Sequence, residues 1–233
     1  MNALHPTLDL AIVCDFDGTA TLLDIGDEIS KRFGGQEHFE LQKARFARGE
    51  LDTRGIIEGI YTHVTAPEEE VRAFAASHAR LRPGFAELIE AARARGAPFY
   101  LASGGLRQYI EAVLEAQLPP EARAYVQLRA NEGLFSPQGL RVRFPSDEAS
   151  RRAGCAVCGS CKRVSVAEAR AAGARRVLGI GDGFADRCLV QFADRTFARE
   201  GSFLHRHCLE RGLAHTPFTE LFDAADAVRH GDC

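Results

Sequence analysis

Several features that would indicate a membrane or nucleic-acid protein are missing from this chain. None of its apolar runs is long enough to span a bilayer. The 233 residues carry a net charge of −3 without a basic stripe, so we expect no membrane and no nucleic-acid partner. The N-terminal residues have no positive charge ahead of an apolar segment, which argues against an export signal. The expected location is the cytoplasm.

Internal repeats and low-complexity segments are also absent, and the composition is ordinary for a globular protein. Hydrophobic residues make up 45% of the chain, which is enough for one good-sized core with a small subdomain. Seven cysteines are present, but nothing in the sequence indicates the oxidising compartment in which disulfides persist.

A short apolar run near the N-terminus ends in two carboxylates. Residues 8–14 are predicted to form a buried strand, and Asp15 and Asp17 follow it two positions apart. Because side chains alternate along a strand, both can point into the crevice where open α/β sheets bind ligands. Two acids this close repel each other unless a cation lies between them, which favours a hard divalent metal. Gly18 then lets the backbone turn, and Thr19 adds a hydroxyl.

A helical region follows this first strand. Between residues 36 and 80 the apolar residues fall at helix-like spacings, and Pro67 with the three acids after it is typical of a helix start. We therefore divide the chain into a core, residues 1–20 and 81–233, and a compact helical insertion, residues 21–80.

Strands and helices alternate in the rest of the chain. A strand at residues 97–102 is predicted to end in a Ser-Gly-Gly turn, and a strand from residue 176 ends in an acidic, glycine-bearing tip. Backbone amides at the helix start after residue 105 would bind phosphate well. The other predicted elements are strands at residues 125–129 and 195–198, a hairpin reaching residues 140–144, a loop at residues 146–154, and helices at residues 83–94, 106–114, 164–172, 202–211 and 218–229.

This alternation predicts an α/β fold, namely a Rossmann-like doubly wound parallel sheet with a small helical cap inserted after the first strand. The predicted strand ends would bring Asp15 and Asp17 to the same edge as Ser103, and also as Asp182 and Asp186. Each of these motifs is a weak signal alone, and their convergence favours a functional site.

The motifs occur in a recognisable order. A DxDGT segment at residues 15–19 is followed by Ser103, by Lys162 and by a GDGxxD segment at residues 181–186. Together they resemble the haloacid dehalogenase superfamily, and the insertion is similar to the small cap of its phosphoserine-phosphatase-like branch. The resemblance implies a Mg²⁺-dependent phosphatase that works through an aspartyl phosphate.

The resemblance also implies roles for the acidic residues. Asp15 would be the nucleophile, and Asp17 would protonate the leaving oxygen and then deprotonate the attacking water. Asp182 would complete the Mg²⁺ ligands together with Asp15 and the backbone carbonyl of Asp17. Asp186 would act through a water or as the partner of a ligand.

Phosphate recognition is implied for four further residues. Lys162 would offset the phosphate charge as a point cation, and the phosphate oxygens would be held by Ser103, by the N–H of Gly104 and by Thr19. A non-catalytic phospholigand-binding module is the alternative of another class, although a binder has no need of a general acid at Asp17. A phosphotransferase or mutase is the other enzyme alternative.

The later half of the chain bears on the substrate. Residues 158–162, 193–194, 197–199 and 212–218 resemble the methionine-salvage phosphatases, which act on 2-hydroxy-3-keto-5-methylthiopentenyl 1-phosphate. The alternative is a phosphoserine phosphatase or another small-metabolite phosphatase, and the composition of the insertion leaves the enolphosphate and phosphoserine both open. It offers cations for the phosphoserine carboxylate and apolar side chains for a thioether. The cations are Arg45, Arg48 and Arg54, and the apolar side chains are Phe33, Phe39, Phe46 and Ile57.

Either substrate is a small phosphorylated metabolite that a cap could enclose. A phosphoprotein or a nucleic acid would be too large for such a lid. For the assembly we expect a monomer or a homodimer.

Three cysteines form a C-x2-C-x2-C array just before Lys162, at Cys155, Cys158 and Cys161. The spacing resembles that of metal ligands, but a structural zinc site needs a fourth ligand. Cys188, Cys208, Cys233 or a histidine could supply it. Since no second tight cluster marks the fourth ligand, we expect free or adventitiously oxidised thiols, with an iron–sulfur site as a further alternative.

Overall fold

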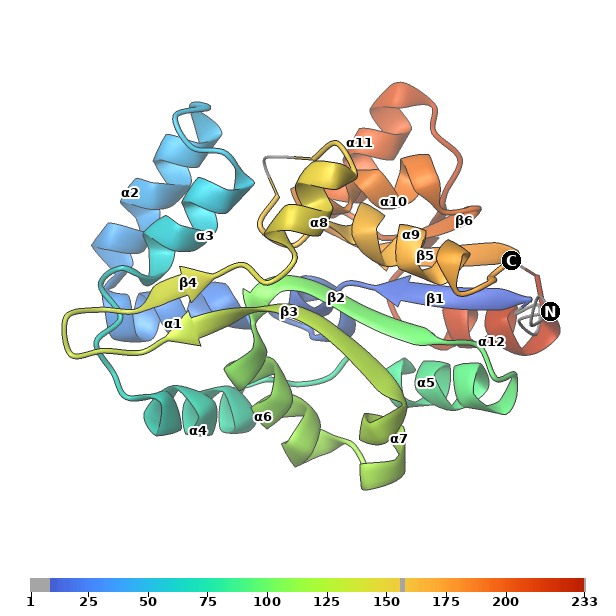
Figure 1. The fold of residues 1–233 in the computed structure, drawn as a ribbon, viewed down its shortest axis with the longest axis horizontal. Coiled ribbons are helices and arrows are strands. Elements are labelled where there is room, and N and C mark those ends of the chain that lie inside the picture. The colour runs from blue at the N-terminus through green and yellow to red at the C-terminus, as the bar shows by residue number, and fades with distance from the viewer. Residues whose placement is uncertain (1–8, 156–157, 233) are drawn as a thin grey trace, which may run out of the picture.

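The computed structural model describes residues 9–155 and 158–232, which contain one seven-stranded sheet (Figure 1). The strand order is β4-β3-β2-β1-β5-β6-β7, with β1 (Leu10–Cys14) in the middle. Neighbouring strands pair in parallel, except that β4 runs antiparallel to β3. The predicted doubly wound α/β sheet is confirmed. The remaining strands are β2 (Phe99–Leu106), β3 (Val126–Leu134), β4 (Arg141–Arg143), β5 (Arg176–Gly181), β6 (Arg195–Arg199) and β7 (Thr216–Phe218).

Helices cover both faces of this sheet (Figure 1). The order reverses at β1, which has β2 on one side and β5 on the other, so a crevice opens at its carboxyl end. No helix among residues 9–155 and 158–232 is long and apolar enough to cross a membrane. One face carries α5 (Phe85–Ala94), α6 (Arg107–Gln117), α7 (Pro120–Tyr125) and α12 (Phe222–His230), and the other carries α9 (Lys162–Ala171), α10 (Arg187–Phe192) and α11 (Phe203–Arg211).

The insertion after β1 is helical, as predicted. Its two ends pair with each other, because the N–H of Leu22 donates to the carbonyl of Arg80 and the N–H of Arg82 donates to that of Ala20. The chain therefore leaves the sheet and returns to it at one place. The helices of the insertion are α1 (Ile25–Gly34), α2 (Gln36–Ala47), α3 (Thr53–Tyr61) and α4 (Glu68–His78). Its treatment as a separate domain stays a prediction.

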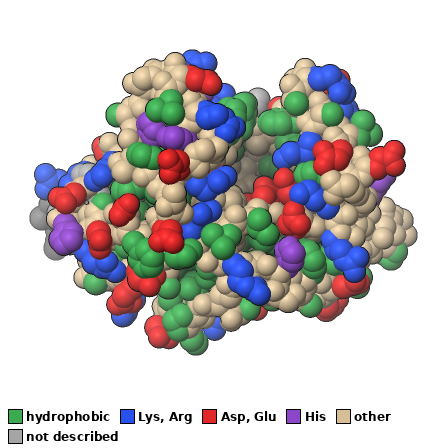
Figure 2. Space-filling view, turned by 180° about the vertical axis from the view of Figure 1, so that it is seen from behind, with side chains coloured by type: hydrophobic (Ala, Val, Ile, Leu, Met, Phe, Trp, Pro, Cys, Tyr) green, Lys and Arg blue, Asp and Glu red, His purple; other side chains and the backbone are tan. Residues whose placement is uncertain are grey.

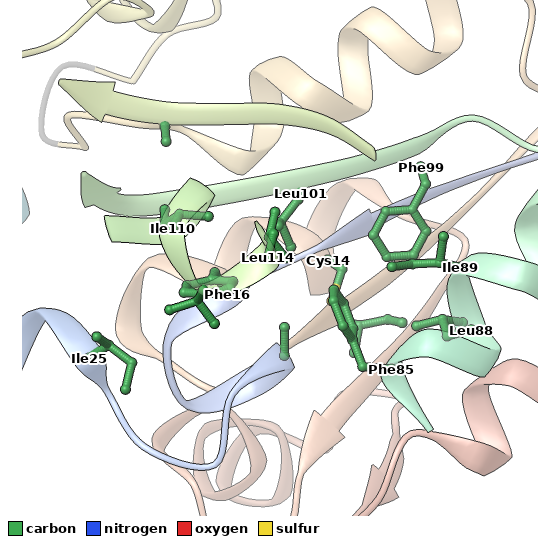
Figure 3. Close-up of a cluster of buried hydrophobic side chains, with 14 of the residues drawn as sticks. Cys14, Phe16, Ile25, Phe85, Leu88, Ile89, Phe99, Leu101, Ile110 and Leu114 are labelled. Atoms are coloured by element: carbon green, nitrogen blue, oxygen red, sulfur yellow. The ribbon is translucent and has the colours of Figure 1, made fainter. Parts of the chain in front are cut away.

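The core lies on both faces of β1, whose five residues are all buried. This explains why the strand is a continuous apolar run rather than an alternating one. On one face the buried side chains of β1 and β2 meet those of α5 and α6, and the cluster continues through Phe16 to Ile25 of α1 (Figure 3). On the other face Val13 packs in a cluster with Val166 and Leu189. The apolar contacts of the insertion are thus continuous with the core.

Two strands continue beyond their predicted ends. Residues 103–105 were expected to form a turn after the second strand, but β2 continues through them to Leu106, with a shift in its register against β3. A Cβ on Gly105 would lie 1.8 Å from the Tyr109 hydroxyl, so the glycine lets this backbone pass under a tyrosine. Similarly, β3 extends beyond the predicted end at residue 129 to Leu134, where it pairs with β4 in the predicted hairpin.

Other boundaries also differ from the predictions. The segment 146–154, expected to be a loop, contains α8 (Asp147–Arg152). The last predicted helix begins at Phe222 instead of residue 218, because Phe218 belongs to β7. Pro217 obscured this short strand, yet a proline is tolerated there because β7 lies at the edge of the sheet.

Gly84 provides a test of how closely α5 and α12 pack. Its φ is +88°, and a Cβ there would lie 2.4 Å from the backbone nitrogen of Phe222. Gly96 also has a positive φ, of +64°, but the space around it is open. We therefore expect Gly84→Ala to lower the free energy of unfolding by at least about 2 kcal/mol more than Gly96→Ala. Urea denaturation of both variants measures this difference. Equal losses would show that α12 can move to make room for the Cβ without a further loss of stability.

Candidate active site

A cavity of about 260 Å³ opens at the carboxyl ends of β1, β2 and β5, and residues of α2 and α3 form its other wall. In Figure 2 the surface is hollowed between the lobe of α2 and α3 and the lobe of α11, and acidic side chains gather in the hollow. The structure brings nearly all of the predicted site residues together here. Those that line the cavity are Asp15, Asp17, Ser103, Gly104, Lys162, Asp182 and Asp186.

Three of these residues form a compact carboxylate group. One oxygen from each of Asp15, Asp182 and Asp186 lies within 4.8 Å of the others. Burial raises the pKa of Asp15 well above its usual value, and the charge of Asp186 raises it further. The same two causes raise the pKa of Asp182. Such mutual repulsion between hard oxygen ligands fits a divalent cation such as Mg²⁺.

Lys162 lies inside this group. Its Nζ is 2.7 Å from Asp15 Oδ1 and 3.1 Å from Asp186 Oδ1, and its side chain is almost completely buried. Burial alone would lower the pKa of Lys162, but the two carboxylates raise it above its usual value, so the ammonium keeps its proton. A fixed positive charge therefore lies beside the predicted nucleophile, at the first residue of α9.

Asp17 occupies a separate pocket beside this group. Its Oδ1 accepts hydrogen bonds from the N–H groups of Ile25, at 2.9 Å, and Gly26. Its Oδ2 accepts from the Tyr109 hydroxyl at 2.6 Å and from Ser103 at 3.3 Å. Burial raises the pKa of Asp17 to about 6, although these hydrogen bonds act in the opposite direction. Asp17 can thus hold a proton near neutral pH, as a general acid must.

The structure separates the side chain of Asp17 from the carboxylate group. The sequence analysis expected Asp186 to act through a water or as the partner of a ligand. In the structure it contributes an oxygen to that group directly. Any share of Asp17 in metal binding would come from its backbone carbonyl, as the sequence analysis expected. The hydroxyl of Thr19 donates to Asp182 Oδ1 at 3.0 Å, and the residue is fully buried. Thr19 therefore orients Asp182, and its contact with phosphate stays a prediction.

Arg82 is an important residue that the sequence analysis missed. Its buried guanidinium donates to the carbonyl oxygens of Gly18, Thr19 and Thr21 in the turn after β1, and to that of Thr219. These bonds hold the turn that carries Asp17 in place. No local motif marks this arginine, because its partners are distant in the sequence.

Arg199 and two tyrosines were also missed. Arg199 lies 2.9 Å from Asp182 Oδ2, so both oxygens of that carboxylate have a partner. The hydroxyl of Tyr61, on α3, is hydrogen-bonded to that of Tyr109, on α6, which in turn donates to Asp17. The only available signal for Arg199 was its place within a resembling segment, and the tyrosines had none.

Comparison with known proteins agrees with this geometry. The family model described as haloacid dehalogenase-like hydrolase matches residues 12–191, which is more than half of the chain. The chain belongs to this family. The haloacid dehalogenase-like motifs at residues 15–19 and at Lys162 both fall within the matched range.

Curated relatives within the family cover nearly the whole chain. A 2-hydroxy-3-keto-5-methylthiopentenyl-1-phosphate phosphatase of Geobacillus kaustophilus is 30% identical over 224 residues, 96% of this chain and 97% of that relative. One of Bacillus velezensis is 27% identical over 222 residues, 94% of this chain and 89% of the relative. A substrate-bound phosphoserine phosphatase shares the fold, with a TM-score of 0.68 at 16% identity over 94% and 97% of the two chains. The haloacid dehalogenase-like chain is therefore a phosphatase.

The raised pKa of Asp17 predicts a pH-dependent stability in the metal-free protein. A folded-state value of about 6, against 3.8 for the free side chain, contributes stability that is complete below pH 3.8 and is lost as the pH rises through 6. The amide introduced by Asp17→Asn does not titrate, and like the protonated acid it offers both an acceptor and a donor. We expect the stability of the wild type relative to Asp17→Asn to fall by on the order of 2 kcal/mol between pH 4 and 7.

Chemical denaturation in the presence of a chelator measures this difference. Tyr109→Phe is the matched variant, because it removes one hydrogen bond that favours the ionised carboxylate and leaves the carboxyl itself. It should move the transition to higher pH. A difference between wild type and Asp17→Asn that stays constant with pH would show that Asp17 ionises normally.

Proposed function

We propose that this phosphatase hydrolyses 2-hydroxy-3-keto-5-methylthiopentenyl 1-phosphate, with Mg²⁺ and through an aspartyl phosphate on Asp15. The observation that carries the proposal is the two-sided character of the cavity. Charged groups suited to phosphoryl transfer lie on its floor, whereas an apolar wall lies opposite on the inserted helices. The name of the curated relatives supports the same substrate.

The chain's own residues divide the reaction between them. A carboxylate oxygen of Asp15 attacks phosphorus, while the ammonium of Lys162 offsets negative charge beside it. The proton on Asp17 passes to the leaving oxygen, and the carboxylate that remains then takes a proton from the water that hydrolyses the phosphoenzyme. Ser103 Oγ accepts from the N–H of Gly105 and donates to Asp17, which orients this acid toward the cavity floor.

The carboxylate group accounts for the metal in this scheme. Asp15, Asp182 and Asp186 would hold Mg²⁺, because three carboxylates with Lys162 and Arg199 as their cations still leave a net negative charge. When bound, the ion neutralises charge on the phosphoryl oxygens. Thr19 and Arg199 keep the Asp182 carboxylate oriented for this role.

The apolar wall suits the thioether end of the substrate. Ile57 lies directly over the end of β2, where Ser103 and Gly104 would hold the phosphate, since a Cβ on Gly104 would be 3.2 Å from its Cδ1. Phe46 of α2 lies across the cavity mouth from Phe184, and the centroids of the two rings are 5.5 Å apart. Ile56 and Ile60 complete the wall. Phe33 and Phe39, the other two predicted candidates, do not line the cavity; Phe33 packs on Phe74 instead.

The cations that phosphoserine would need are engaged elsewhere. Arg45 and Arg48 bind Glu50, and Arg54 binds Glu58 and Asp147; none of the three arginines lines the cavity. Apart from Lys162, the cation among the described lining residues is Lys43, which is paired with Asp27 at 3.2 Å. A free amino-acid carboxylate would have to compete for that ion pair, which favours the enolphosphate.

The nucleophile assignment predicts separate effects for two variants. Asp15→Asn should lower turnover by at least about a thousandfold, because an amide is a poor nucleophile. Asp17→Asn should still form the phosphoenzyme from an activated substrate such as p-nitrophenyl phosphate, but hydrolyse it slowly, because the base for water is gone. Intact-protein mass spectrometry after rapid quenching should detect phosphorylated protein in the second variant and none in the first. Folded Asp15→Asn protein with substantial activity would refute the scheme.

Substrate preference tests the specific proposal. We expect a higher kcat/KM for the enolphosphate than for phosphoserine in parallel assays with Mg²⁺. Ile57→Ala should lower kcat/KM for the enolphosphate about tenfold or more and leave that for p-nitrophenyl phosphate nearly unchanged, because an apolar contact to a remote group is lost. Leu41→Ala, an exposed position on α2, is the control. A clear preference for phosphoserine would overturn the proposal but leave the phosphatase chemistry intact.

A further inference from the structure

A second group of potential metal ligands lies outside the cavity. The thiol of Cys161 interacts with those of Cys158, Cys188 and Cys155, and Cys158 also interacts with Cys155. Cys158 and Cys161 are buried, and together with Val164 they form an apolar cluster against which Cys155 and Cys188 pack. None of the four lines the active-site cavity. The fold therefore gathers four sulfurs that the proposed phosphatase chemistry does not use.

The structure selects Cys188 from the candidate fourth ligands that the sequence offered. Cys188 lies on α10, far along the chain from the C-x2-C-x2-C array, and the packing of α10 against α9 brings it to Cys161. The expectation of free thiols depended on the lack of such a ligand. With it, the array has the number and the spacing of ligands typical of a structural zinc site.

We propose that Cys155, Cys158, Cys161 and Cys188 bind one structural Zn²⁺ ion. Four thiolates at about 2.3 Å from a tetrahedral ion are a complete coordination shell, so the site would be closed to substrate. No three of these sulfurs lie within 4.8 Å of one another, so they would have to move closer together to bind the ion.

The surroundings of Cys161 favour its thiolate form. Cys161 is the residue that precedes α9, and it accepts a hydrogen bond from the backbone N–H of Arg163 in the first turn. Thiolates are stabilised at helix N-termini. At Cys188 the neighbouring Cys161 and burial raise the pKa of the thiol, and the charge of Arg187 acts in the opposite direction. The helix N-terminus and Arg187 would offset part of the net charge of −2 that four thiolates and one Zn²⁺ carry.

The position of the site indicates what the ion would do. Cys161 directly precedes Lys162, and Cys188 follows Asp186 by two residues. Lys162 and Asp186 form an ion pair at 3.1 Å on the cavity floor. A zinc ion joining the starts of α9 and α10 would therefore fix two charged residues of the active site relative to each other, without contact with the substrate.

Metal analysis of tag-free protein tests this proposal. We expect about one zinc per chain in the wild type, and below about a tenth of that in Cys188→Ser and in Cys155→Ser, which remove ligands from opposite sides of the site. Cys208→Ser is the matched control. Cys208 is a buried cysteine packed against Leu204 in a separate cluster, and its removal should leave the zinc content unchanged.

Cobalt substitution provides a readout that does not depend on the folding of a variant. Wild-type protein reconstituted with Co²⁺ should show the intense thiolate-to-cobalt charge-transfer absorption of a tetrahedral tetrathiolate site, and this absorption should persist when Mg²⁺ saturates the carboxylates. The proposal would be overturned by wild-type protein without zinc or by zinc retained in Cys188→Ser. Stoichiometric iron, or a Cys158–Cys161 disulfide in protein purified under reducing conditions, would also overturn it.

Discussion

The structure depends on the confinement of three carboxylates and one ammonium group in a buried space at the end of β1. Asp15, Asp182 and Asp186 come from two different strand ends, and Lys162 comes from the start of a helix. Burying like charges is unfavourable unless each is paired, and Lys162 and Arg199 together cannot neutralise three acids. The segments that carry these residues must therefore be held by contacts elsewhere. The guanidinium of Arg82 on the turn after β1, and the partners of Asp182 at Thr19 and Arg199, serve this purpose.

The same constraint links the inserted helices to Asp17, the proposed general acid. Asp17 accepts hydrogen bonds from the first amides of α1, and Tyr109 connects it to Tyr61 on α3. Two helices of the insertion thus contribute directly to the environment that sets the pKa of Asp17. If the insertion moved away from the sheet, water would reach this carboxyl and its pKa would fall toward the ordinary value, because burial is the main cause of its elevation. Proton donation is therefore strongest when the insertion covers the cavity.

Much of the fold and the floor of the site could be predicted from the sequence, because those features are local. The run before Asp15 is apolar at every position, as a strand covered on both faces must be, and the motifs follow the strands directly. The features that the sequence did not predict depend on contacts between residues that are distant in the sequence. Residues 103–105 look like a turn until Tyr109 is seen to cover Gly105, and Arg82 acquires a role only when the turn after β1 and Thr219 come together around it. Cys188 likewise joins the other cysteines only through helix packing.

The distribution of these features also explains why the chemistry was easier to infer than the substrate. The floor residues have the charges that phosphoryl transfer calls for whatever the rest of the substrate is. A phosphoserine phosphatase of 16% identity shares the fold. The wall, in contrast, consists of side chains on the inserted helices such as Phe46 and Ile57, whose aliphatic and aromatic character also fits an ordinary core. A sequence pattern cannot distinguish a side chain that faces the cavity from one that packs inward. That distinction separates Phe46 from Phe39, and it requires the helices to be placed over the sheet.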